Sequence, residues 1–159
     1  MNQLFRKDCI FISEQNAMPG LFEEISGKLL DKGLVTPEFL PNLLKREAAY
    51  PTAIDLAILQ RDLPNIAVPH TESAHVNTRL IIPVKLTQPV LFGNMIAPKE
   101  QLPVKCLFMI LNNDPEGQAN VLAAVMDFVT KNDAAELQEF FGASDIDGMY
   151  TYLIDHFEF

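Results

Sequence analysis

Short apolar runs alternate with amphipathic helical patterns along this 159-residue chain. Residues 66–68, 80–86 and 104–111 are apolar or rich in β-branched side chains and are bounded by proline or asparagine, which is typical of strands. Because helical and strand patterns interleave, we expect an α/β fold: a single-domain layered sandwich whose largely buried sheet is covered by helices.

Apolar side chains recur at helical spacing in five segments. Gly33 ends the first helix, the sequence Thr36-Pro37-Glu38 predicts an N-cap and first turn for the second, and Ser144 is the expected cap of the last. The predicted helices cover residues 17–32, 36–49, 115–131, 134–141 and 144–157.

Two connections are less regular. The weak pattern of residues 52–65 predicts an irregular segment, with a helical turn near residues 54–60. The apolar residues 90–92 are expected to form a hairpin with the preceding strand across Thr87-Gln88-Pro89, so the sheet should be mixed.

Composition excludes several functions. A net charge of −9 argues against nucleic-acid binding, which needs a dense basic face. The first residues contain no apolar leader, and no uninterrupted apolar run is long enough for a bilayer span, so we expect no membrane insertion. With Cys9 and Cys106 interpreted as free thiols, a cytoplasmic location is expected.

An apolar strand ends abruptly at Pro69 and His70, and a polar loop follows. Proline lacks an amide hydrogen, so it should end the strand and direct His70 into the crevice at the strand's end. Neutral imidazole is a nucleophile at neutral pH, and a hydrogen bond from its other ring nitrogen to a backbone carbonyl would fix the tautomer. Residue type alone leaves two interpretations open, a nucleophile or a hydrogen-bonded structural histidine.

Three segments, taken in order along the chain, point to a known family. They are Lys45-Arg46-Glu47, then Ile-Ala-Val-Pro-His-Thr-Glu-Ser-Ala-His-Val at residues 66–76, then Pro-Val-Leu-Phe-Gly at residues 89–93 with the later turn at residues 113–118. Together they resemble the enzyme IIA component of the phosphoenolpyruvate-dependent sugar phosphotransferase system, in the mannitol/fructose superfamily and closest to its galactitol-type branch.

The resemblance covers nearly the whole chain and implies one phosphocarrier domain over residues 1–159 with the mannitol/fructose-type enzyme IIA fold. It implies that His70 accepts a phosphoryl group from the small histidine phosphocarrier protein and donates it to a cysteine of enzyme IIB during uptake of galactitol or a related sugar. No metal or cofactor is implied, and the only partners are proteins.

The resemblance also assigns residues around His70. Arg46 matches an arginine kept near the phosphorylated histidine, where a guanidinium would stabilise the charge on the transferring oxygens. Gln118 stands where mannitol-type members have a second histidine, and it can donate an amide hydrogen bond but supplies no charge. A solvated Arg46 and a structural Gln118 are the alternatives.

Thr52, Thr71 and His75 are further candidates. The two hydroxyl groups would bind the phosphoryl group, and His75 would relay a proton or phosphate, although a surface histidine is the simpler interpretation. The alternative overall function is a regulatory binding module in which phosphorylation of His70 only switches partner association.

Overall fold

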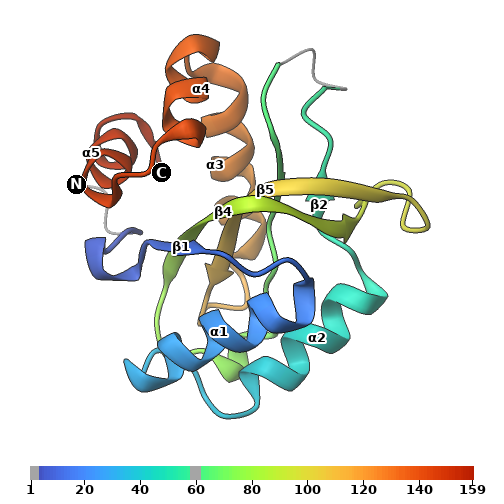
Figure 1. Ribbon diagram of the computed structural model, residues 1–159. Coiled ribbons are helices and arrows are strands. Elements are labelled where there is room, and N and C mark those ends of the chain that lie inside the picture. The colour runs from blue at the N-terminus through green and yellow to red at the C-terminus, as the bar shows by residue number, and fades with distance from the viewer. Residues whose placement is uncertain (1–3, 58–61) are drawn as a thin grey trace.

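The computed structural model describes residues 4–57 and 62–159. A five-stranded sheet forms its centre, and helices lie on both sides of the sheet (Figure 1). The strands are β1 (Phe11–Ser13), β2 (Ala53–Ile54), β3 (Asn65–Ala67), β4 (Leu80–Gly93) and β5 (Gln101–Leu111). The helices are α1 (Met18–Asp31), α2 (Phe39–Ala49), α3 (Gln118–Lys131), α4 (Ala134–Gly142) and α5 (Ile146–His156), with short 3-10 helices η1 (Lys7–Cys9) and η2 (Ser73–His75).

The strand order is β1-β4-β5-β3-β2. β1 runs parallel to β4 and β3 runs parallel to β5, whereas the β4–β5 and β2–β3 pairs are antiparallel. The predicted mixed sheet and layered α/β fold are therefore confirmed.

The sheet separates two apolar cores. One core contains side chains from α1 and α2 together with Ala67, Ile82 and Leu107. The other contains side chains from α3, α4 and α5 together with Ile66 and Phe108. Figure 1 shows the same division, with α1 and α2 on one side of the sheet and α3, α4 and α5 on the other. Successive strand residues thus point into opposite cores, which explains why these runs are apolar throughout.

The predicted hairpin at Thr87-Gln88-Pro89 is wrong. Residues 80–93 form the single strand β4, and Val90–Gly93 pair with β5, not with the preceding part of their own strand. The register shifts between Lys85 and Val90, so residues 86–89 form a bulge in the pairing of β4 with β5. Pro89 is tolerated there because β1 pairs only with residues 84–86 and the bulge needs no amide hydrogen from it.

The structure corrects several helix starts. α2 begins at Phe39, whose amide donates to the carbonyl oxygen of Thr36 at 3.0 Å, so the Thr36 side chain is not the cap. α3 begins at Gln118 after a turn in which Gly117 N donates to Asp114 O. The cap of α5 is Asp145, not Ser144, and its carboxylate accepts from Asp147 N at 3.1 Å.

The segment that follows α2 contains the short strand β2, which was not predicted. Ile54 belongs to β2 and pairs with Ile66 of β3, so the predicted helical turn does not begin there. The part of that turn at residues 58–60 lies outside the described residues. Within residues 4–57 and 62–159, no helix combines the length and the apolar character needed to span a bilayer.

Candidate functional site

A cavity of about 270 Å³ lies where the chain leaves β3 and where α3 begins. α2 contributes one residue to the cavity wall, the loop after β3 contributes three, and η2 contributes one. The other four come from the end of β5 to the first residue of α3. Its lining consists of Arg46, His70, Thr71, Glu72, Ser73, Asn112, Asp114, Pro115 and Gln118. The fold therefore places His70, Arg46, Thr71 and Gln118 around one cavity, although they come from three separate parts of the sequence.

His70 is half-buried, and its ring is held by its own backbone. Nδ1 lies 2.9 Å from the carbonyl oxygen of Val68, two residues earlier. In the neutral imidazole Nδ1 is then the protonated nitrogen that donates, and Nε2 keeps its lone pair. Pro69 does not end the pairing with β5, because its carbonyl accepts from Ile110 N at 3.0 Å. His70 is thereby anchored beside β5 with one ring nitrogen free to react.

The surroundings of His70 favour its neutral form. Burial lowers the pKa of the imidazole below its ordinary value, and the positive charge of Arg46 lowers this pKa further. The hydrogen bond to Val68 acts in the opposite direction but does not outweigh burial. At pH 7 the Nε2 lone pair is therefore available.

Arg46 lies near the end of α2 and brings a positive charge to the cavity. Its guanidinium carbon lies 5.4 Å from the ring centroid of Tyr50, a cation–π contact that restrains the side chain. Its Nε atom is buried and has no hydrogen-bond partner among the described residues. A planar guanidinium held in this way can bind the oxygens of an anion in the cavity.

Gln118 is the first residue of α3, and its side-chain amide is oriented by Asn112. Asn112 Nδ2 donates to Gln118 Oε1 at 3.2 Å and to the carbonyl oxygen of Asp114 at 2.7 Å. The amino group Nε2 of Gln118 is buried and has no hydrogen-bond partner in residues 4–57 and 62–159. Gln118 thus contributes an unused donor to the cavity wall.

Two predicted phosphate-binding hydroxyl groups already have other acceptors. The Thr71 hydroxyl donates to the carbonyl oxygen of Glu72 at 3.0 Å, although Thr71 lines the cavity. Thr52 does not line it, and its buried hydroxyl donates to Glu47 Oε1 at 2.9 Å. The structure therefore does not place Thr52 among the residues of the cavity wall.

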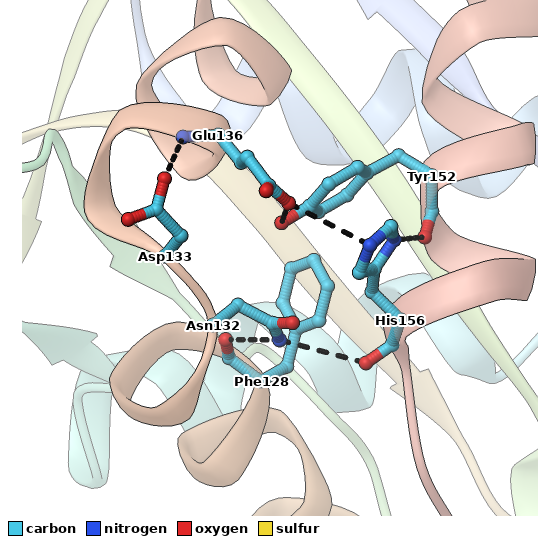
Figure 2. A network of polar contacts seen from close by, with 6 residues as sticks. All are labelled: Phe128, Asn132, Asp133, Glu136, Tyr152 and His156. Carbon is cyan, nitrogen blue, oxygen red and sulfur yellow. Dashed lines mark hydrogen bonds and ion pairs between the residues drawn. The ribbon is translucent and has the colours of Figure 1, made fainter.

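His75 lies in η2 and is not among the residues that line the cavity. His156 lies in α5, stacked on the ring of Tyr152 with centroids 4.1 Å apart (Figure 2). Its Nδ1 lies 3.1 Å from Tyr152 O, and its Nε2 lies 3.6 Å from Glu136 Oε1. The contact with Glu136 ties α5 to α4.

Several residues of the cavity were not predicted. The sequence indicates Asn112 only as part of a turn, and Glu72 and Ser73 only as parts of a loop. The carboxylates of Glu72 and Asp114 are exposed, which leaves Arg46 as the half-buried charge beside His70. The one available signal was the polar run at residues 112–114 directly after the apolar strand.

The cavity combines a nucleophilic nitrogen, a cation and a neutral donor. This set suits a small anion that becomes covalently attached to imidazole. In the parts of the chain that the structure describes, no three His, Cys, Asp or Glu side chains lie close enough to hold a metal ion.

One protein-family model matches nearly the whole chain. The family model described as "Phosphoenolpyruvate-dependent sugar phosphotransferase system, EIIA 2" matches residues 3–155. A comparison with curated protein sequences finds no match.

Solved structures share the fold. The IIA mannitol protein of Escherichia coli is 17% identical with a TM-score of 0.73, over 94% of this chain and 98% of that chain. The same values of identity and TM-score are found for a complex of E. coli enzyme IIA Mtl with phosphorylated enzyme IIB Mtl, over 95% and 97%. The nitrogen regulatory protein IIA-Ntr of Neisseria meningitidis is 19% identical with a TM-score of 0.63, over 95% and 97%.

The family match extends over almost the entire chain, and the mixed sheet with helices on both faces is the fold of these structures. The chain therefore belongs to the EIIA 2 family of the phosphoenolpyruvate-dependent sugar phosphotransferase system and is a phosphotransferase component.

Proposed function

We propose that His70 is the phosphoryl carrier of this protein. Nε2 attacks the phosphorus atom of the phosphohistidine on the histidine phosphocarrier protein, so that a new N–P bond forms and the donor's N–P bond breaks. A cysteine thiolate of enzyme IIB then attacks the same phosphorus, which forms an S–P bond and returns Nε2 to its free state. The Nδ1 proton stays hydrogen-bonded to the carbonyl oxygen of Val68 through both steps.

The observation that carries this proposal is the hydrogen bond from His70 Nδ1 to Val68 O, because it leaves Nε2 as the reactive nitrogen. Arg46 stabilises the charge that spreads over the equatorial oxygens during transfer. Gln118 donates a neutral hydrogen bond to the same group, which fits the galactitol-type branch, where a second histidine is not expected. Thr71 and His75 contribute no direct contact in this scheme.

The partners in this proposal are the histidine phosphocarrier protein and an enzyme IIB, and the protein works in the cytoplasm. The solved complex of an E. coli enzyme IIA with phosphorylated enzyme IIB supports the second partner by analogy of fold. The membrane component selects the sugar, which we propose is galactitol or a related sugar.

Intact mass spectrometry tests the first transfer. The protein is incubated with phosphoenolpyruvate, enzyme I and the phosphocarrier protein, and one added acid-labile phosphoryl group is expected in the wild type and none in His70→Ala. A wild-type protein that stays unmodified, or a modified His70→Ala variant, would overturn the proposal.

Transfer to enzyme IIB separates transport from regulation. Phosphorylated protein is mixed with enzyme IIB, and the phosphoryl group is expected to move to a cysteine of that partner. A stable complex with no transfer would instead support the regulatory binding module.

A further inference from the structure

Glu47 follows Arg46 in α2 but points to different surroundings. It is only 5% exposed, and it does not line the cavity. Both of its carboxylate oxygens accept hydrogen bonds from one residue: Thr52 N donates to Oε2 at 2.8 Å and the Thr52 hydroxyl donates to Oε1 at 2.9 Å. A buried carboxylate with two specific donors fixes the position of the residue that supplies them.

The hydrogen bonds continue from Thr52 to His70. The carbonyl oxygen of Thr52 accepts from Val68 N at 3.3 Å, and the carbonyl oxygen of Val68 accepts from His70 Nδ1 at 2.9 Å. The adjacent pairing of Ala53 with Ala67 keeps the two backbones in register. Val68 is therefore fixed through its amide by the segment that Glu47 holds, while its carbonyl sets the tautomer of the imidazole.

We propose that Glu47 is a positioning residue for His70, acting through Thr52 and the backbone of Val68. This inference rests on the proposed role of His70 as the phosphoryl carrier. Because Arg46 and Glu47 are neighbours on α2, one helix places both the cation of the cavity and the anchor of the imidazole. The geometry thus assigns Thr52 to the alignment of His70 and not to binding of the phosphoryl group.

The hydrogen bonds between Glu47 and Thr52 determine which substitutions test the proposal. Thr52→Ser retains both donors, whereas Thr52→Val has nearly the same shape and lacks only the hydroxyl donor. Glu47→Ala removes both acceptors and leaves two buried donors of Thr52 without partners. Leu153→Ala provides the matched control, since Leu153 is fully buried in α5 within the other core and its truncation destabilises the protein without touching this chain of bonds.

The first measurement is ¹⁵N NMR of the histidine ring nitrogens, which reports the tautomer directly. In wild type and Leu153→Ala, we expect His70 to be protonated at Nδ1 when neutral. In Glu47→Ala and Thr52→Val, a mixture of the two tautomers is expected, and Thr52→Ser should restore the wild-type spectrum. A purely structural Glu47 would lower stability in its variants and leave the His70 tautomer unchanged, and that result would overturn the inference.

The second measurement is the rate of phosphoryl transfer from the phosphocarrier protein at 25 °C. We expect a loss on the order of tenfold or more in Glu47→Ala and a smaller loss in Thr52→Val, because misalignment of a reacting group is costly. Wild-type rates in both variants would also overturn the inference. If the wild type accepts no phosphate, the proposed function fails, and the NMR spectra still decide whether Glu47 positions His70.

Discussion

Asn112 Nδ2 lies 3.2 Å from Gln118 Oε1, and this contact decides which end of the Gln118 amide is left to interact with a ligand. Asn112 is itself fixed, because its Oδ1 accepts from Asp114 N at 3.1 Å while its Nδ2 also donates to Asp114 O. The amino group of Gln118 therefore has no partner among the described residues, at the start of a helix whose dipole favours an anion. An acidic side chain at position 118 would place its own negative charge there and repel an anion in the cavity.

Gln118→Ala is expected to slow phosphoryl transfer about tenfold, since it removes one hydrogen bond to a charged group. Gln118→Glu should slow it more, because a carboxylate repels the phosphoryl oxygens. Rapid-quench measurement of transfer from the phosphocarrier protein compares the two variants. A Gln118→Glu variant as fast as wild type would contradict a contact between this side chain and the phosphoryl group.

Arg46→Ala should reduce the transfer rate by roughly a hundredfold or more, because no other cation lines the described cavity. The same change should raise the pKa of His70, since the charge of Arg46 lowers it. Arg46→Lys keeps the charge but loses the planar fork, so an intermediate rate is expected. Rate and pKa are measured by rapid quench and by NMR titration. An unchanged His70 pKa in Arg46→Ala would show that the two groups do not interact.

His70 should accept phosphate at pH values below the ordinary imidazole pKa. Burial and Arg46 both lower the pKa of His70, so the neutral ring with a free Nε2 persists as the pH falls through 6.5. The pH profile of transfer to this protein, measured under single-turnover conditions, should therefore have its acidic midpoint below 6.5. A midpoint above the ordinary value would contradict the assigned surroundings of the ring.

Glu47 should make the protein more stable at mildly acidic pH. Burial raises the pKa of Glu47 to about 7 from an ordinary value of 4.5, so between these values the folded state binds more protons than the unfolded state. The free energy of unfolding then falls as the pH rises through this window, by roughly 3 kcal/mol at most. Urea unfolding from about pH 5 to about pH 8 should show this slope in the wild type but not in Glu47→Gln. If the free energy of unfolding depends on pH in the same way in both proteins, the raised pKa of Glu47 is contradicted.

Phe108→Ala should lower the free energy of unfolding by about 3–5 kcal/mol. Phe108 is fully buried in β5, and its ring lies 5.9 Å from that of Phe128 and 6.4 Å from that of Phe140. Truncation leaves a cavity between the sheet and the helices α3 and α4. Chemical denaturation measures the loss, and a cost below about 1 kcal/mol would mean that the core collapses to fill the space.

The sequence predicted those elements whose signals are local. The helical spacing of apolar residues in α1, α3 and α5 and the apolar runs in β3 and β5 each arise within one segment, so these elements could be predicted. The sequence pattern predicts two strands in place of β4, because Thr87-Gln88-Pro89 resembles a turn. Only the register with β5 and the limited length of β1 show that they form a bulge. β2 has two residues and carries no pattern of its own.

The site was predicted in part for a similar reason. The position of His70 after an apolar strand is a local signal, and the family resemblance supplied Arg46, Gln118 and Thr71, which the fold brings to the same cavity. The partners of Thr52 and Gln118 depend on how α2, β2 and α3 approach one another. No pattern along the chain shows that Thr52 binds Glu47 or that Asn112 orients Gln118.

Gly93 ends β4 where the strand meets Pro51, just before Thr52. A Cβ atom at position 93 would lie 2.8 Å from Pro51 Cβ, which is closer than real side chains approach. The glycine at the end of the motif at residues 89–93 is therefore required by close packing against Pro51, in the segment that leads to Thr52. Among related chains, a larger residue at position 93 should therefore occur together with a smaller residue at position 51. The two positions should change in pairs during evolution, because their side chains share the same space.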